Sequence, residues 1–292
     1  MGNAALILAA GSARCVVHPA LGGSLGGWTV AGQDMLHTAT SEDVAAHDPL
    51  RMSSFPLVPY SNRIGEARFN WAGDQVQLAP NFAPEPHAIH GVGWKRAWNV
   101  IEQEAAQVTL GYSHAANADW PWAFTAEQTI AVTETALTLT LRARNDHNVP
   151  VPLAFGHHPY FDAAGARLRF GAEGVWMSGA DALPTARVTP TGDFDFRAGA
   201  AVEGRAVDHC YTGWAGVARI DWAGRPHALE LTATPNLPAA VIYIPTGGDS
   251  FCFEPVPHIN NALNLNGKEP TIPIIAPGEW FEAKIVMRAL TI

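Results

Sequence analysis

Charged residues are scarce in this 292-residue sequence, and basic residues are scarcer than acidic ones. Asp, Glu, Lys and Arg make up 15% of the chain, and 18 basic against 27 acidic residues give a net charge of −9. The basic residues form no dense run, whereas a surface that binds nucleic acid needs a clustered basic patch. We therefore expect no nucleic-acid partner and favour a neutral or weakly polar ligand.

Cysteine is rare as well. Cys15, Cys210 and Cys252 are odd in number, lie far apart and include no Cys-x-x-Cys pair. This pattern argues against the disulfide framework of a small secreted domain and against a zinc knuckle. A reducing compartment is the default for such a chain, and we predict a cytoplasmic protein.

Long apolar runs are also missing. A helix that crosses a bilayer needs about 20 consecutive apolar residues, and no stretch of this sequence approaches that length. The apolar run 4–10 has no basic segment before it and is interrupted by Gly11 and Ser12, so it does not fit a secretory signal. We interpret it as a first strand and predict no membrane association.

Helical periodicity is nearly absent, and strand-like alternation of apolar and polar residues takes its place. The alternating segments include 108–112, 125–132, 137–141, 229–233, 241–244 and 284–290. Turn signals separate them, and the 27 Gly and 22 Pro are spread evenly, without a linker or an internal repeat. The sequence predicts one all-β domain spanning 1–292, with antiparallel sheets joined by hairpins.

Two Pro-rich segments, 79–86 and 255–264, are too apolar and too local to be tethers. We expect them to be ordered loops over an edge or a face of the sheets. Loops of that kind often carry functional residues.

A first polar cluster ends the apolar run in the segment 55–64, where Asn62 and Arg63 are adjacent. The Arg63 guanidinium is a rigid fork of donors suited to paired hydroxyls or to a carboxylate. A structural ion pair at a strand end is the alternative interpretation.

Histidines mark two further clusters. His87 and His90 precede glycines that permit a close backbone approach, and one of the two histidines is a candidate to face a ligand. His157 and His158 are adjacent at the end of a strand-like run. Neighbouring residues on a strand point to opposite faces, so at most one of these two enters a given cleft, and periodicity does not say which. An ordinary structural histidine is the alternative for each.

Glu254 is the informative residue of a fourth cluster, because Phe251 and Phe253 precede it. A carboxyl group in apolar surroundings is desolvated, which raises its pKa toward the range useful for a general base. A glutamate on the solvent side of an edge strand is the alternative, since alternation permits it. Asp208 is a fifth candidate, and an Asx turn explains it equally well.

Taken together and in order, these segments resemble the aldose 1-epimerase family, also called galactose mutarotases. Each motif is short, but their joint order covers nearly the whole chain. The matching landmarks are 19–24, 55–64, 81–98, 119–121, 158–161, 208–211 and the segment that contains Glu254. The resemblance implies a large antiparallel β-sandwich, the galactose-mutarotase-like supersandwich, and no cofactor.

The resemblance also implies roles for two residues in catalysis. Glu254 matches the general base of such enzymes, and His158, rather than His157, matches the general acid. The reaction opens and recloses the ring of a free aldose and so interconverts its anomers. With Glu254 ionised and His158 protonated, the pKa of the histidine must be held up, by Asp208 or by another nearby carboxylate. This interpretation predicts a bell-shaped pH profile.

Further residues are implied to bind the substrate, a monosaccharide. Arg63, His90 and Asp208 match residues that contact sugar oxygens, and we place Asn62 with them. Asp208 is followed by His209 where many family members carry Asn. No cluster of Arg and Lys surrounds these motifs to hold a phosphate, which disfavours phosphorylated hexoses.

Two other functions compete with an epimerase. A carbohydrate-binding or regulatory protein of the same fold would bind sugar without turnover. A metal-dependent, cupin-like enzyme would use His87, His90, His157 and His258, although their spacing suits a metal poorly, and we predict no metal. The preferred aldose, the oligomeric state and a part for His157 or His90 in proton transfer stay open at this point.

Overall fold

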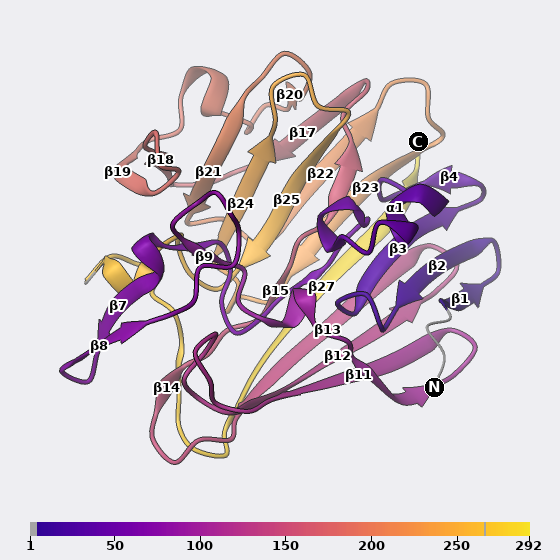
Figure 1. The fold of residues 1–292 in the computed structure, drawn as a ribbon. Coiled ribbons are helices and arrows are strands. Elements are labelled where there is room, and N and C mark those ends of the chain that lie inside the picture. Colours follow the sequence, from indigo (N-terminus) through magenta and orange to yellow (C-terminus); the bar gives the residue numbers. More distant parts are fainter. Residues whose placement is uncertain (1–4, 266) are drawn as a thin grey trace.

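The computed structural model describes residues 5–265 and 267–292, and most of its regular structure is strand. The largest sheet is antiparallel, with nine strands in the order β10-β11-β12-β13-β27-β23-β22-β17-β20 (Figure 1). Its strands are β10 (Asn99–Gln103), β11 (Gln107–His114), β12 (Phe124–Val132), β13 (Ala136–Asn145), β27 (Trp280–Thr291), β23 (His227–Ala233), β22 (Val217–Trp222), β17 (Ala166–Phe170) and β20 (Ala200–Ala201).

A second antiparallel sheet has six strands in the order β16-β25-β24-β21-β18-β19. Its strands are β16 (Tyr160–Asp162), β25 (Ser250–Val256), β24 (Ala239–Ile244), β21 (Val207–Thr212), β18 (Gly174–Ser178) and β19 (Pro184–Val188). All six segments in which the sequence alternates lie within strands of these two sheets, so the strand prediction is confirmed.

Aromatic side chains join the two sheets. Phe170 on β17 of the larger sheet contacts Tyr211 on β21 and Phe253 on β25 of the smaller one, with ring centroids 5.1 and 5.0 Å apart. All three side chains are buried. The two sheets therefore enclose a common core, which confirms the predicted antiparallel β-sandwich.

The N-terminal residues form a smaller sheet of four strands, β1 (Leu6–Ala10), β2 (Ala13–His18), β3 (Ser24–Val30) and β4 (Gln33–Asp34). The first strand is the one expected from the run 4–10, of which residue 4 lies outside the described residues. Strands β1 and β2 lie against β12 of the nine-stranded sheet.

Short elements fill the connections between the sheets. The helical ones are α1 (Ser41–Ala45) and the 3-10 turns η1 (Pro49–Arg51), η2 (Gly65–Ala67), η3 (Gly93–Lys95), η4 (Gly192–Phe194) and η5 (Ala262–Asn264). The others are two-stranded pairs: β5 (Pro56–Leu57) with β15 (Gly156–His157), β6 (Arg63–Ile64) with β9 (Ala88–Ile89), β7 (Arg68–Trp71) with β8 (Asp74–Gln77), and β14 (Val151–Pro152) with β26 (Ile274–Ile275). Several of them cover the face of the six-stranded sheet that points away from the core, and a cavity lies between them and that face.

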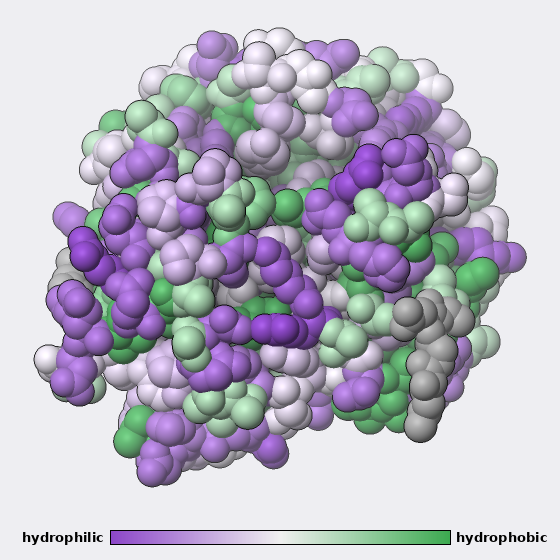
Figure 2. All heavy atoms as spheres, in the orientation of Figure 1, coloured by the Kyte–Doolittle hydropathy of each residue, from purple (hydrophilic) through white to green (hydrophobic). Residues whose placement is uncertain are grey.

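Hydrophilic and hydrophobic residues are intermixed on the face of the molecule shown in Figure 2. Within the described residues, none of the helices has the length and apolarity needed to span a bilayer.

Candidate active site

The outer face of the six-stranded sheet carries the carboxyl groups of the site. Glu254 on β25 is paired with Val241 on β24, and Asp208 on β21 with Tyr243 on β24. Directly paired residues share a face and side chains alternate along a strand, so all four point away from the core. Strand β25 is an interior strand, and Glu254 is only 1% exposed because loops cover it. The alternative of a solvated glutamate on an edge strand is therefore wrong.

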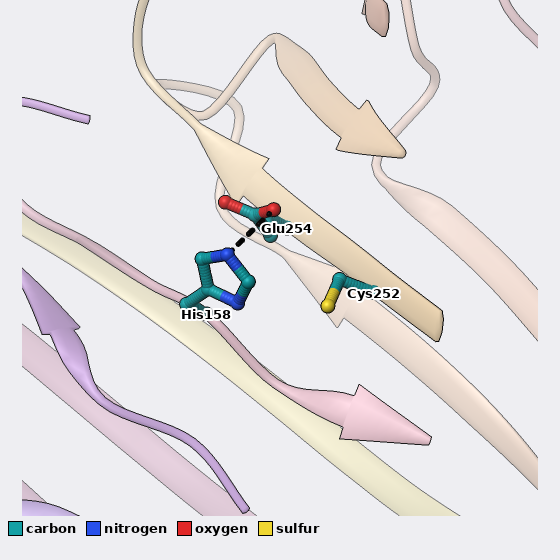
Figure 3. A group of neighbouring side chains, drawn as sticks. All are labelled: His158, Cys252 and Glu254. Atoms are coloured by element: carbon teal, nitrogen blue, oxygen red, sulfur yellow. Dashed lines mark ion pairs between the residues drawn. The ribbon is translucent and has the colours of Figure 1, made fainter. Parts of the chain in front are cut away.

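His158 faces Glu254 from the segment between β15 and β16. Its backbone N–H donates to the carbonyl oxygen of Phe55 at 2.9 Å, and its ring packs nearly parallel to the rings of Phe55 and Tyr160, with centroids 4.6 and 4.8 Å away. The stacking fixes the plane of the imidazole. Nε2 then lies 3.3 Å from Oε1 of Glu254 (Figure 3). Sequence positions almost 100 residues apart thus form one buried pair of a carboxyl group and an imidazole.

His157 has different partners from those of its neighbour. One ring nitrogen contacts the hydroxyl of Ser54, and the other lies 3.1 Å from Oε1 of Gln128. The ring is fully buried, and both of its nitrogens are occupied. His157 is placed as a structural histidine, while His158 borders the cavity.

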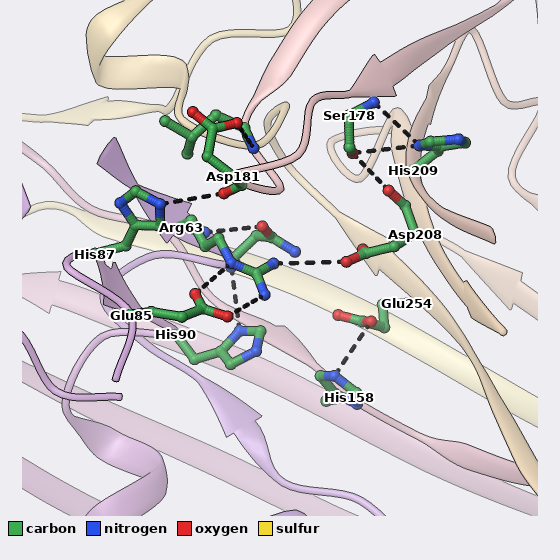
Figure 4. Close-up of polar contacts among 12 residues, drawn as sticks. Arg63, Glu85, His87, His90, His158, Ser178, Asp181, Asp208, His209 and Glu254 are labelled. Atoms are coloured by element: carbon green, nitrogen blue, oxygen red, sulfur yellow. Dashed lines mark hydrogen bonds and ion pairs between the residues drawn. The ribbon is translucent and has the colours of Figure 1, made fainter. Parts of the chain in front are cut away.

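Arg63 on β6 lies between two carboxylates. Its Nε and NH2 groups donate to Oε2 and Oε1 of Glu85 at 2.7 and 2.9 Å, and NH1 lies 3.7 Å from Oδ2 of Asp208 (Figure 4). A bidentate pair fixes both the position and the plane of the guanidinium. Hydrogen bonds from Arg63 lower the pKa of the Glu85 carboxyl. Arg63 thus forms a structural ion pair and also lines the cavity, so both interpretations of this residue apply in part.

His90 and Asn62 form a tight backbone contact at the cavity. Both have left-handed backbone conformations, with φ of 58° and 55°. The N–H of His90 donates to the carbonyl of Asn62 at 3.0 Å, and the N–H of Asn62 donates to Nδ1 of His90 at 3.1 Å. Nδ1 is therefore an acceptor, which leaves Nε2 as the protonated nitrogen of the neutral ring. The ring stands edge-on to His158, with centroids 5.2 Å apart.

The cavity that these residues border has a volume of about 370 Å³, of the size of a small-molecule site. All six residues expected from the sequence lie around it. The sequence did not single out the other residues that line it, namely Leu50, Phe82, Glu85, Ile89, Tyr160, Val241 and Tyr243. Phe82 and Glu85 belong to the Pro-rich loop 79–86, which the sequence predicts to be an ordered loop of a kind that often carries functional residues, without marking either residue. Tyr160 lies two residues after His158 in the same motif, and this proximity is the feature of the sequence that could have identified it as a cavity residue.

Burial sets the proton affinities of the pair. Desolvation, with a further contribution from the negative charge of Asp208, raises the pKa of Glu254 well above its usual range, and Arg63 opposes this shift. Desolvation lowers the pKa of His158. The expectation that a carboxylate holds the pKa of His158 up is therefore wrong, because burial dominates and Asp208 acts on Glu254 instead. The pKa of Asp208 is itself raised by burial.

The four histidines of the metal-enzyme alternative do not converge. Nδ1 of His87 accepts from the N–H of Glu66 at 3.0 Å, and Nε2 of His258 accepts from the N–H of Ser61 at 3.2 Å. Their other ring nitrogens lie beside backbone carbonyl oxygens, and His157 is occupied as described. Of the four, His90 lines the cavity. This arrangement gives a shared metal no support.

Comparison with known sequences points in one direction. A family model described as aldose 1-epimerase matches residues 5–288 of this chain. The uncharacterized protein YphB of Escherichia coli K12 is 30% identical over 252 residues, which cover 81% of this chain and 83% of that protein.

Comparison with solved structures agrees. A candidate aldose 1-epimerase from Escherichia coli K12 has a TM-score of 0.92 and 26% identity over the full length of both chains. A galactose mutarotase-like protein from Clostridium acetobutylicum has a TM-score of 0.88 and 19% identity, covering 99% of this chain and 95% of that one. A galactose 1-epimerase from Lactobacillus acidophilus NCFM has a TM-score of 0.78 and 17% identity, covering 96% and 92%. The fold is thus the galactose-mutarotase-like sandwich that the sequence resemblance implied.

Proposed function

The chain belongs to the aldose 1-epimerase family, and from this membership we propose that it interconverts the α and β anomers of a free aldose. The observation that carries the proposal is the buried pair of Glu254 and His158, with Oε1 and Nε2 3.3 Å apart at the cavity. The reaction needs one group that takes a proton from the anomeric hydroxyl and one that gives a proton to the ring oxygen. The pair supplies both.

The ring opens by two proton transfers. Glu254, as the carboxylate, takes the proton of the anomeric hydroxyl while protonated His158 gives its proton to the ring oxygen, and the bond between C1 and the ring oxygen breaks. Rotation about the C1–C2 bond then presents the other face of the aldehyde. The two transfers run in reverse, and the ring closes as the other anomer.

Burial favours the proton arrangement that ring opening produces. In the proposed reaction the two residues share one proton. Because they interact strongly, the observed pKa values describe the pair as a whole and not Glu254 or His158 alone. Because burial raises the pKa of Glu254 and lowers that of His158, a protonated Glu254 beside a neutral His158 is the favoured arrangement. This is the arrangement that accompanies the open-chain aldehyde. The pocket therefore supports the intermediate of the reaction.

The residues around the pair suit the hydroxyl groups of a neutral sugar. Arg63 is already paired with Glu85 and approached by Asp208, so its charge is not free for a phosphate or a carboxylate. Its remaining N–H groups, the protonated Nε2 of His90 and the Asp208 carboxylate offer both donors and acceptors. We assign Arg63, His90, Asp208 and Asn62 to sugar binding.

Polarimetry of freshly dissolved α-D-glucose and α-D-galactose tests the proposal. The wild type is compared with Glu254→Gln and with Glu102→Gln, a matched change at an exposed position on β10. We expect the wild type and Glu102→Gln to accelerate the change in rotation above the buffer rate, and Glu254→Gln to return it close to that rate. Full activity in Glu254→Gln would show that Glu254 is not the base.

A wild-type protein that binds sugars without accelerating anomer exchange for any of several aldoses would instead be a carbohydrate-binding protein. Sugar binding by calorimetry, carried out beside polarimetry, separates the two functions. We also propose a cytoplasmic location, which the three free and buried cysteines support because they suit a reducing compartment.

A further inference from the structure

A third donor group lies beside the acid–base pair and has no part in the proposed reaction. Cys252 is on β25, two residues before Glu254, so alternation points its side chain to the same outer face. Its thiol is free and fully buried. One donor atom from each of His158, Cys252 and Glu254 lies within 4.8 Å of the other two (Figure 3). Phe253, between the cysteine and the glutamate, points into the core instead.

The triangle of donors is close to the size that a metal ion requires. Three atoms that lie within 4.8 Å of one another place an ion at their centre no more than about 2.8 Å from each, whereas Zn²⁺ binds nitrogen, oxygen and sulfur at roughly 2.0–2.3 Å. Side-chain movements below about 1 Å close that difference. The nitrogen of histidine, the sulfur of cysteine and the oxygen of a carboxylate are each ligands that Zn²⁺ binds in proteins.

Two buried atoms of the pair have unused capacity. Oε2 of Glu254 and Nδ1 of His158 have no hydrogen-bond partner among the described residues. Buried polar atoms in folded proteins usually have a partner, so an unpaired carboxylate oxygen at a cavity is a place where a ligand gains favourable contacts. This observation is independent of the position of Cys252, and it shows that both members of the pair have capacity for a further ligand.

We propose that a thiophilic divalent cation such as Zn²⁺ binds to His158, Cys252 and Glu254 and thereby inhibits the enzyme. Ligands of sulfur, nitrogen and oxygen favour such ions over Mg²⁺ and Ca²⁺. Metal ligands must be deprotonated, so the thiol proton and the proton shared by the pair are released to solvent. The ion occupies the two groups that would transfer protons, His158 and Glu254, both of which line the cavity. The metal and the sugar therefore compete for the site.

Inhibition of the metal-free enzyme by Zn²⁺ is the first test. Cys252→Ser removes the sulfur ligand. Cys210→Ser is its matched control, because Cys210 is also free and buried and lies on the same outer face, paired with Val241. We expect Zn²⁺, and not Mg²⁺, to inhibit the wild type and Cys210→Ser competitively with the sugar. Loss of a ligand should raise the Zn²⁺ concentration needed in Cys252→Ser by roughly tenfold or more. Equal inhibition of both variants would overturn the proposal.

Titration with Co²⁺ provides a readout that does not depend on activity. A cobalt–thiolate bond gives a charge-transfer absorption band, which we expect in the wild type and in Cys210→Ser and not in Cys252→Ser. No band in the wild type at saturating Co²⁺, with no Zn²⁺ bound in equilibrium dialysis, would also overturn the proposal. The inhibitory effect rests on the proposed function, but metal binding does not. A protein that binds cobalt through Cys252 and lacks epimerase activity would refute the proposed function alone.

Discussion

The two faces of the six-stranded sheet are built by the same strands but differ in what covers them. On the inner face, Phe251 and Phe253 are fully buried in a core shared with the nine-stranded sheet. On the outer face, Cys252 and Glu254 are buried to nearly the same degree, but short loops cover them and a cavity lies beside them. Side chains of one strand are thus equally buried in two different environments. The inner face is apolar and closed, whereas the outer face is polar and adjoins a cavity.

The difference shows that burial has opposite effects on the two faces. Burial of an aromatic ring favours folding through the hydrophobic effect. Burial of a carboxyl group with an unpaired oxygen opposes folding and raises its pKa. The inner face therefore stabilises the fold, whereas burial of Glu254 on the outer face opposes folding, as the proposed function as an epimerase would require of a buried general base. Four changes test this contrast.

The largest effect on the outer face should come from Glu254→Gln. Removal of a general base lowers the turnover rate by about 10²- to 10⁴-fold. Because Oε2 has no partner and Gln replaces the protonated carboxyl group with an uncharged amide of nearly the same shape, we expect no loss in the free energy of unfolding. Polarimetry and urea denaturation measure the two quantities. A variant that loses activity because it unfolds would contradict the contrast between the faces.

On the inner face, Phe253→Ala should act in the opposite way. The ring packs against Phe170 and Trp214, with centroids 5.0 and 5.3 Å away. Loss of a buried phenylalanine costs about 3–5 kcal/mol of unfolding free energy. Urea denaturation measures the loss in unfolding free energy. Polarimetry at low temperature, where the variant is still folded, should give a KM for the sugar close to that of the wild type. A strongly raised KM in the folded variant would argue that the faces are not independent.

A smaller effect is expected from Glu85→Gln. The change weakens the bidentate pair that orients Arg63, so KM should rise by about tenfold, which corresponds to about 1.4 kcal/mol, while kcat changes little. Glu127→Gln is the control, since it breaks a similar pair with Arg142 on the nine-stranded sheet. Steady-state polarimetry resolves kcat and KM. A fall in kcat alone would place Glu85 with the proton-transfer groups instead.

The smallest effect concerns the pair of His37 and Asp162, whose ring nitrogen and carboxylate oxygen are 2.8 Å apart at the end of β16. The hydrogen bond to Asp162 raises the pKa of His37, against the effect of burial. Burial would raise the pKa of Asp162, but hydrogen bonds from His37 and Arg225 outweigh it and lower this pKa.

The contribution of His37 to stability is complete below its ordinary pKa of 6.5 and is lost as pH rises through the raised value. The contribution of Asp162 is complete above its ordinary pKa of 3.8 and is lost as pH falls through the lowered value. Both are present between these two ordinary values. His37→Ala should therefore reduce the unfolding free energy by no more than about 1 kcal/mol, mainly near pH 5. Urea denaturation at pH 5 and pH 9 checks this, and an equal loss at both would contradict it.

The sequence predicted the site unevenly. Glu254, His158, Arg63, His90, Asp208 and Asn62 were named from their motifs, and all of them border one cavity. Glu85 was missed because a glutamate in a Pro-rich loop has no local feature that marks it, and its partner Arg63 is 22 residues away. The direction of the His158 pKa was wrong, since the loops that desolvate the ring come from distant parts of the chain.

By itself, the sequence determined the principal strands and which side chains of one strand share a face, because side chains alternate along a strand with a period of two residues. It did not determine which of the two faces is buried against the other sheet, so the positions of Glu254, His157 and His158 stayed open. It also determined which titratable groups are available for the proposed proton transfer. Only the tertiary structure decided that groups from β6, β9, β21, β25 and the segment before β16 meet at one cavity. It also decided how strongly each is desolvated, because desolvation depends on packing between residues far apart in the chain.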